Sequence, residues 1–340
     1  MARRAGRVLA ATTLAVGLVL SLGSAALAAP VGTLKQFKVP TANSQPRAIT
    51  NGSDGNRWFT EGTEFTSAPA KIGRITPTGS ISEFAPEVAD GCNVCIITDI
   101  AQGPGGILYI TSNDPTLMRF EVATQSFATP VSMPNTGALG GNLAVSATEV
   151  WITDFNNDVV WRYQLSTGQF TSFPVTDPAD VAVDGAGNAW FTQPGDVNAP
   201  GTSTIGRIDA ATGAVTTTPT TDGSTTVAPR SITVAADGQV WFTARFVPQG
   251  VGRLNPTTGV VTIFLTPSNP GPEGIAASPD GSVWFTQETK GNAASITNAG
   301  VITEGKAVRG SEPFGITVAA NGDPWYTMMA ANKIATLQLQ

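Results

Sequence analysis

The chain has 340 residues, of which 37 are glycine, 24 are proline and 13% are charged, while 41% are apolar. This composition predicts many short strands joined by tight turns, and it excludes a disordered chain because the apolar content can fill a large core. The net charge of −6 and the lack of a recurring basic patch argue against nucleic acid as a partner. The sequence contains no histidine, which excludes Ser-His-Asp catalysis and Cys/His zinc sites.

The first 28 residues match the three-part pattern of a secretory signal peptide. Three arginines before residue 8 give a positive start, an apolar run from Val8 to Leu22 follows, and Ala26-Leu-Ala28 provides a cleavage site near Ala28. The run is short for a membrane anchor, which is the alternative interpretation. We therefore expect a secreted, extracellular protein with no membrane contact after cleavage, carrying 16 basic against 25 acidic residues and a net charge of −9.

One three-residue phrase recurs through the rest of the chain. Its copies stand 51, 42, 39, 51, 43 and 41 residues apart. A period of about 40–50 residues with strand-forming residues is typical of β-propeller blades. The seven copies, which predict seven blades, are Trp58-Phe-Thr, Tyr109-Ile-Thr, Trp151-Ile-Thr, Trp190-Phe-Thr, Trp241-Phe-Thr, Trp284-Phe-Thr and Trp325-Tyr-Thr.

Each copy belongs to the same pattern of four antiparallel strands. An alternating apolar run such as Ser231-Ile-Thr-Val comes first, a tight turn such as Asp237-Gly follows, and the Trp-Phe-Thr strand is next. A third strand reads Ile205-Gly-Arg-Ile or similar, and a fourth, such as Val260-Val-Thr-Ile-Phe, ends the repeat. The sequence therefore predicts an all-β fold, a seven-bladed β-propeller of four-stranded antiparallel blades.

The two ends of the repeat region complement each other. The seventh copy stops after its third strand, near Leu339, whereas the chain after the signal segment begins with an unaccompanied fourth strand at Gly32–Val39. We expect this N-terminal strand to complete the last blade and close the ring, which removes the exposed edge of an open array. The repeat fills residues 31–340, so a single propeller domain is predicted.

The two cysteines are close together, in Gly91-Cys-Asn-Val-Cys. In an oxidising compartment we expect Cys92 and Cys95 to form a disulfide across a tight turn. The alternative, a redox-active pair, is typical of a βαβ context, which this sequence lacks.

Propeller topology predicts where a site would lie. The loop before the first strand of a blade and the loop after its second strand open on the same face, so their residues are expected to surround the central funnel. Asp99, Asn142 and Asp180 precede the first strands of three successive blades, with Asp154 nearby. Converging oxygens of this kind suit a divalent cation such as Mg²⁺ or Ca²⁺. Alternatively, these short polar side chains cap turns.

A second polar sector is expected on the later blades. It comprises Arg230, Arg245, Glu273, Gln287 and Glu288, with Arg47 across the funnel. One interpretation is a site for a polar or acidic ligand; the other is a set of surface ion pairs, which contribute little to stability. The candidate ligand-binding residues are Arg47, Glu61, Arg230, Arg245 and Phe314.

The repeat Ile-x5-Gly-x2-Trp-Phe-Thr, followed by Ile-Gly-Arg-Ile-x-Pro-x-Thr-Gly, resembles the streptogramin lyase family, that of virginiamycin B lyase. NHL-type propellers share a related pattern. The resemblance implies a Mg²⁺-assisted elimination that opens a cyclic depsipeptide at an ester. It also implies a histidine base before the first strand of a late blade and a metal-holding glutamate after that blade's Trp-Phe-Thr strand. At these positions the sequence has Glu273 and Gln287, with Glu288 one step further.

The absence of histidine changes what this resemblance implies for activity. Glu273 could act as a general base only if burial disfavoured its charged form, and Arg230 nearby has the opposite effect. We therefore expect a secreted, monomeric propeller that binds a small molecule, peptide, glycan or cell-surface polymer at its funnel, with the elimination chemistry changed or lost. The alternatives are a divalent-metal-dependent lyase or lactonase that uses carboxylates, and a non-catalytic scaffold for protein interactions.

Overall fold

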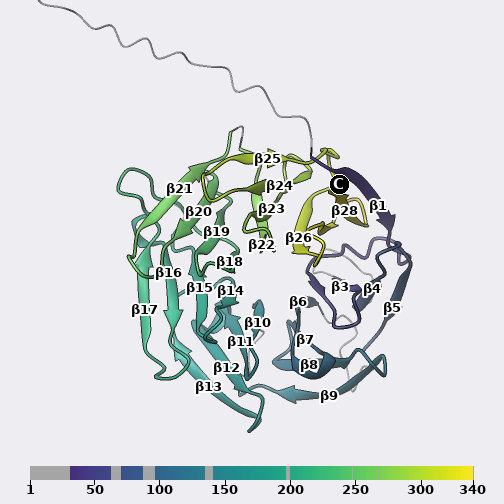
Figure 1. The fold of residues 1–340 in the computed structure, drawn as a ribbon. Coiled ribbons are helices and arrows are strands. Elements are labelled where there is room, and N and C mark those ends of the chain that lie inside the picture. The colour runs from purple at the N-terminus through teal and green to yellow at the C-terminus, as the bar shows by residue number, and fades with distance from the viewer. Residues whose placement is uncertain are drawn as a thin grey trace, which may run out of the picture.

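Seven four-stranded antiparallel sheets make up the described part of the chain and are arranged as blades around one axis (Figure 1). The structure is a computed structural model, and it describes residues 31–62, 70–86, 96–134, 141–196, 200–246, 248–267 and 269–339. The predicted seven-bladed propeller is therefore confirmed. Within these ranges no helix is long and apolar enough to cross a membrane.

In each blade the four strands lie side by side, in order from the central axis to the outer edge (Figure 1). The first, innermost strands are β2 (Ile49–Asn51), β6 (Ile97–Gln102), β10 (Leu143–Val145), β14 (Val181–Val183), β18 (Ile232–Val234), β22 (Pro272–Ala277) and β26 (Pro313–Val318). The second strands, which carry the recurring phrase, are β3 (Arg57–Glu61), β7 (Ile107–Ser112), β11 (Glu149–Asp154), β15 (Ala189–Gln193), β19 (Val240–Ala244), β23 (Val283–Gln287) and β27 (Pro324–Met328).

The outer half of each blade is formed by its third and fourth strands. The third strands are β4 (Lys71–Ile75), β8 (Thr116–Glu121), β12 (Val159–Gln164), β16 (Thr204–Ile208), β20 (Gly250–Leu254), β24 (Asn292–Ile296) and β28 (Lys333–Gln338). The fourth strands are β5 (Ile81–Phe84), β9 (Ser126–Ser132), β13 (Gln169–Pro174), β17 (Val215–Pro219), β21 (Val261–Leu265), β25 (Ile302–Glu304) and, in blade 7, β1 (Thr33–Lys38). Short 3-10 turns occur at η1 (Pro104–Gly106), η2 (Phe155–Asn157) and η3 (Pro200–Thr202).

The N-terminal strand closes the ring, as the sequence predicted. β1 pairs antiparallel with β28, which places Leu34 opposite Leu337 and Phe37 opposite Ile334. The Phe37 ring stacks on Trp325 of the same blade, with ring centroids 5.8 Å apart. Because the first and last described strands share one sheet, the ring has no open blade edge.

Burial of both faces explains the residues of the second strands. In β3, Trp58, Phe59 and Thr60 are all 0% exposed, although alternate residues of a strand point to opposite faces. Neighbouring blades cover both faces, so consecutive residues of the strand are buried instead of alternating between buried and exposed. The Phe59 ring lies directly on Gly73 of β4, where an added Cβ would come within 2.1 Å of the ring. This contact explains the glycine in Ile-Gly-Arg-Ile.

In six of the seven blades, the threonine of the recurring phrase links its blade to the next one. In every blade its side chain is fully buried, and the set Thr60, Thr111, Thr153, Thr192, Thr243, Thr286 and Thr327 is called the threonine belt below. In blade 6, the Thr286 hydroxyl accepts the backbone N–H of Gly274 at 2.9 Å and donates to the carbonyl of Phe314 in blade 7 at 2.7 Å. The same onward bond is made by Thr111 to Gly141, Thr153 to Ala179, Thr192 to Arg230, Thr243 to Glu273 and Thr327 to Arg47.

Two sequence predictions lie outside the described residues. These are the signal peptide at residues 1–28 and the disulfide between Cys92 and Cys95, and both stay predictions.

Substituting a belt threonine tests the link between blades. Thr286→Val keeps the shape of the side chain but leaves the Gly274 N–H and the Phe314 carbonyl without this partner, so we expect a loss of about 2 kcal/mol or more in the free energy of unfolding. Urea denaturation measures this loss. The exposed Thr217→Val is the matched control, with an expected change within about 0.5 kcal/mol. Equal losses of unfolding free energy in the two variants would show that the belt hydroxyl stabilises the fold no more than an exposed threonine does.

Candidate functional site

A cavity of about 170 Å³ lies on the axis, among the starts of the innermost strands. Every blade contributes at least one residue to its lining, including Asp99, Asn142, Asp180, Ser231, Gly274 and Gly315. The glycines mark where the strands come closest, since a Cβ on Gly274 would lie 2.3 Å from the Phe314 carbonyl oxygen. The polar side chains therefore gather on blades 2 to 5, and blades 6 and 7 contribute glycines and apolar residues.

The acidic side chains in this lining also hold neighbouring blades together. Asp99 accepts the backbone N–H of Ile100 in its own strand and that of Leu143 in the next blade, both at 2.8 Å. Asp180 does the same with Val181 and Ile232, both at 2.9 Å. Between them, the Asn142 amide donates to the Ala179 carbonyl at 3.1 Å. Each of the three side chains thus bonds to the backbone of the following blade.

Burial makes both aspartates hard to ionise. Desolvation raises the pKa of Asp99 to about 7, and the nearby Asp180 carboxylate adds to this, while the Leu143 N–H acts against it. Desolvation likewise raises the pKa of Asp180 to about 6, partly offset by its backbone N–H donors and by Arg230. The funnel therefore holds two carboxyl groups that change charge near neutral pH.

The structure brings together three of the four residues predicted to bind a cation. Asp99, Asn142 and Asp180 share one cavity, whereas Asp154 is absent from its lining and accepts hydrogen bonds from Asn157 and Trp161. Within the described ranges, no group of three or more His, Cys, Asp or Glu side chains lies close enough to hold a metal ion. The cation site stays a prediction.

Beside this cavity, four residues of blades 5 and 6 form a compact ion-pair cluster. Arg230, Arg245, Glu273 and Glu288 make it up, and it is called the Arg–Glu cluster below. Arg230 Nε lies 2.9 Å from Glu273 Oε1, and Arg245 Nη1 lies 3.1 Å from Glu273 Oε2. Arg245 Nη2 also reaches Glu288 Oε2 at 2.5 Å. Arg245 therefore bridges two carboxylates.

Exposure in the Arg–Glu cluster is uneven. The Glu273 side chain is 1% exposed, whereas Arg230 and Arg245 are 31% and 35% exposed. Solvent therefore reaches the two arginine side chains, whereas the carboxylate of Glu273 is shielded from it. Between blades 1 and 7 of the propeller, the Arg47 guanidinium lies 4.9 Å from the centre of the Phe314 ring, in a cation–π contact.

Gln287 ends the β23 strand next to this cluster and is almost fully buried, at 1% exposed. Its register partner is Pro272, directly before Glu273. Its Oε1 atom has no hydrogen-bond partner among the described residues. The adjacent Glu288 is less buried, and desolvation raises its pKa, with Arg245 opposing the effect.

Comparison with known proteins identifies the family. The model of the virginiamycin B lyase family matches residues 26–220 and 217–340. The chain belongs to this family. A structure reported as a streptogramin B lyase superposes with a TM-score of 0.76 at 25% identity, over 91% of this chain and 98% of the other. Virginiamycin B lyase from Staphylococcus aureus gives 0.75 at 21% identity, over 91% and 99%.

A third similar structure is a catalytically inactive histidine-to-alanine variant of the Staphylococcus aureus enzyme with quinupristin. It has a TM-score of 0.74 at 21% identity and covers 91% of this chain and 99% of the other. No match to the chain is found among curated proteins.

The family's Mg²⁺ can be tested against the donors at the family-equivalent positions. Both oxygens of Glu273 pair with guanidinium groups, Glu288 pairs with Arg245, and Gln287 supplies only a neutral oxygen. Two arginines therefore already balance the two carboxylates. A hard divalent cation prefers uncommitted anionic oxygens, so these residues do not fit it.

Two features of the site differ from the sequence expectation. The residues that follow the threonine belt were expected to face the funnel, but none lines the channel and all are at most 9% exposed. These residues are Glu61, Ser112, Asp154, Gln193, Ala244, Gln287 and Met328. The belt itself was not recognised from the sequence, although its signal was present, because a threonine ends all seven copies of the recurring phrase.

Glu61 is the clearest case of this burial. It is 1% exposed, and neither oxygen has a hydrogen-bond partner of good geometry among the described residues. Desolvation raises its pKa to about 7; Ser44 and Lys71 oppose this rise, and Glu83 adds to it. Lys71 is itself committed to Glu83, at 2.9 Å. Glu61 therefore resembles a buried neutral acid more than a ligand-binding carboxylate.

The raised pKa of Glu61 predicts how stability depends on pH. The folded protein keeps the Glu61 proton up to about pH 7, whereas the unfolded chain loses it near 4.5, so this group destabilises the fold progressively as the pH rises between these values. Glu61→Gln removes that loss. We expect the variant to equal the wild type at pH 4.5 and to exceed it by up to about 3 kcal/mol at pH 8.

Denaturation of both proteins across this pH range measures the difference. Asp99 and Asp180 also favour the fold at low pH, but they are present in both proteins and cancel in the comparison. The exposed Glu121→Gln is the control for loss of one charge. A constant difference across the range would contradict the prediction.

Proposed function

We propose that this chain is a secreted binding member of the virginiamycin B lyase family. In this proposal the Arg–Glu cluster beside the funnel takes a polar ligand with an anionic group, from a peptide, a glycan or a cell-surface polymer. The family's elimination chemistry is changed or lost. The observation that carries the proposal is Glu273, which replaces the expected base and has both oxygens held by arginines.

The chemistry at Glu273 argues against proton abstraction. A general base needs a lone pair directed at the substrate proton, within hydrogen-bonding reach. Here the lone pairs face Arg230 and Arg245, and the side chain is 1% exposed. One similar structure is described as catalytically inactive after the loss of a single histidine, and this chain has none.

The two partly exposed arginine side chains of the cluster support an anionic ligand. The two partly exposed arginine side chains each end in a planar guanidinium group with several N–H donors, which matches a carboxylate or phosphate. Glu273 holds both of them in place from below, so little side-chain freedom is lost when a ligand binds. The N-terminal signal pattern supports a ligand met outside the cell.

Matched pairs of probes test this proposal. We expect hexaglutamate or hexagalacturonate to bind the purified protein in isothermal titration calorimetry, while hexaglutamine and maltohexaose do not. Arg245→Gln should weaken binding about tenfold or more, because charge-assisted hydrogen bonds are lost. Arg245→Lys should restore part of the affinity, since it keeps the charge but not the fork. High salt should also weaken it.

The controls separate this site from general charge effects. Lys35→Gln removes one positive charge from the exposed outer strand β1 and should leave binding unchanged. The same protein, incubated with quinupristin and Mg²⁺, should leave the ring of the substrate closed. Turnover of quinupristin would overturn the loss of elimination chemistry. Failure of all four probes to bind would favour the scaffold alternative.

A second candidate function is a metal-dependent lyase or lactonase that uses the funnel carboxylates. The specific observation in its favour is Asp99, because a pKa near 7 suits a general base at neutral pH. Asp180, on the same cavity, would be the second carboxylate.

Thermal unfolding tests this candidate. If Mg²⁺ or Ca²⁺ binds there, the metal at a hundred times its dissociation constant should stabilise the wild type by about 2.7 kcal/mol. Asp180→Ala should remove the effect. Glu288→Gln, in the Arg–Glu cluster, should not remove it if the metal lies in the funnel. Unchanged unfolding of the wild type in the presence of either metal removes the candidate.

A further inference from the structure

The outer part of a blade is built on a recurring contact of three side chains. A tryptophan of the second strand and a phenylalanine of the fourth pack together, and the arginine of Ile-Gly-Arg-Ile lies by both rings. In blade 5, Arg253 is 5.5 Å from the Trp241 ring and 5.7 Å from the Phe264 ring, and the two rings stack at 5.8 Å. The same contact is formed by Trp58, Phe84 and Arg74 in blade 1 and by Trp151, Phe173 and Arg162 in blade 3.

Blade 4 has two of these three parts. Trp190 and Arg207 are present, with the guanidinium 5.7 Å from the ring. The strand register places Thr218 opposite Ile205, just as Phe264 lies opposite Val251 in blade 5. Blade 4 therefore has a threonine where blades 1, 3, 5 and 7 have a phenyl ring.

The following blade leaves room for the missing ring as well. In blade 5, Phe264 reaches the turn of blade 6, where a Cβ on Gly300 would come within 2.5 Å of it. The equivalent glycine for blade 4 is Gly259, and a Cβ added there would meet no described atom within 4 Å. In blade 6, by contrast, Leu337 of blade 7 packs against Gly305.

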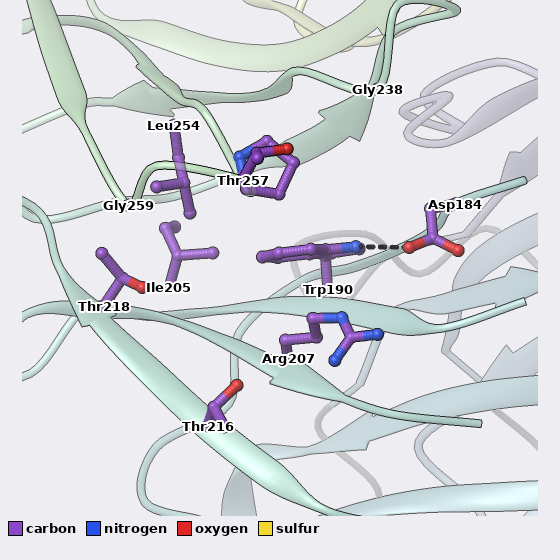
Figure 2. Close-up of a pocket in the computed structure, with 11 residues that line it drawn as sticks. Asp184, Trp190, Ile205, Arg207, Thr216, Thr218, Gly238, Leu254, Thr257 and Gly259 are labelled. Atoms are coloured by element: carbon purple, nitrogen blue, oxygen red, sulfur yellow. Dashed lines mark hydrogen bonds between the residues drawn. The ribbon is translucent and has the colours of Figure 1, made fainter. Parts of the chain in front are cut away.

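The result is a pocket of about 510 Å³ between blades 4 and 5, called the aryl slot below. Figure 2 shows Trp190 with Arg207 on one side and Ile205 and Leu254 toward its end, near Thr218 and Gly259. The Trp190 Nε1 donates to Asp184 at 3.0 Å, which fixes the indole in the slot (Figure 2). Trp190 is 6% exposed, more than the tryptophans that have a phenyl neighbour in their blade: Trp58, Trp151 and Trp241 are 0% exposed and Trp325 is 4% exposed.

We propose that the aryl slot binds an aromatic ring supplied by a ligand, carried by a peptide side chain or by a small aryl compound. The ring would occupy the place of the missing phenylalanine, against Trp190 and by Arg207. Aromatic pairs with centroids about 4.5–7 Å apart, and cations over ring faces, are favourable contacts. The hydroxyls of Thr216 and Thr257 at the rim accommodate polar substituents on the ring.

This site is separate from the Arg–Glu cluster. Asp184 and Gly259 belong to turns that follow first and third strands, whereas the cluster residues lie at or just before the start of first strands or just after second strands. These two sets of loops lie at opposite ends of the strands. The aryl slot therefore does not depend on the function proposed above.

Ligand-observed NMR saturation transfer tests the aryl slot on the purified protein. The probes are N-acetylphenylalanine amide for a peptide-borne ring and benzyl alcohol for a free one. N-acetylcyclohexylalanine amide and methyl glucoside are the non-aromatic and sugar controls. We expect the aromatic probes to bind and the controls to bind at least about tenfold more weakly. Binding of only one aromatic probe would identify which source of the ring the slot accepts.

Filling the slot provides the decisive variant. Thr218→Phe supplies the phenyl ring of the Trp–Phe–Arg contact seen in blades 1, 3 and 5. It should therefore raise the thermal midpoint of unfolding and weaken aryl binding about tenfold or more. Thr217→Phe adds the same ring to the other, exposed face of β17 and should leave binding unchanged. Conversely, Phe264→Thr should open a second slot beside Trp241 and increase the number of bound aryl probes.

Three results would overturn the proposal. They are aryl binding that survives Thr218→Phe, preferred binding of methyl glucoside, and no aryl binding to the wild type. Because Thr218→Phe is expected to stabilise the fold, loss of binding in that variant is not explained by unfolding.

Discussion

The threonine belt is the constraint on which the rest of this propeller depends. Six of the belt hydroxyls accept a backbone N–H of their own blade, and Thr111 accepts the Thr98 hydroxyl instead. The hydroxyls of all belt threonines after Thr60 donate to a carbonyl near the start of the next blade. The hydroxyls are fully buried, so an unpaired partner would have no water to replace it. The belt thereby fixes the spacing of the innermost strands and the narrow channel they surround.

The chemistry available at the funnel follows from that spacing. Asp99, Asn142 and Asp180 reinforce the belt by bonding across blades, and the same packing desolvates the two carboxyl groups. Next to these residues in the ring, Arg230 and Arg245 hold both oxygens of Glu273, and their own side chains stay partly exposed. A position where the family is expected to place a base thus holds two partly exposed arginine side chains in place. This is why we propose binding and not elimination.

Repetition also makes departures from the pattern informative. In three blades a phenyl ring lies between a tryptophan, an arginine and the turn of the next blade. Thr218 takes the position of that phenyl ring in blade 4. Trp190 and Arg207 keep the geometry of the tryptophan and arginine in the complete contacts, and the pocket beside them stays open. The fold tolerates the gap because Trp190 is held by Asp184 and the surrounding core of blades 4 and 5 is otherwise complete.

The sequence by itself determined the architecture: seven copies of one phrase predicted the blades, and the unmatched strand at Gly32–Val39 predicted the closure seen between β1 and β28. Local patterns carry this information because turns and strand periodicity act over a few residues. It also located Glu273 and Gln287 through the family resemblance. Only the tertiary structure decided that Glu61 is buried, that Glu273 is held by two arginines, and that Thr218 leaves an aryl slot. Each of these depends on contacts between blades or strands distant in sequence, which single-chain periodicity does not encode.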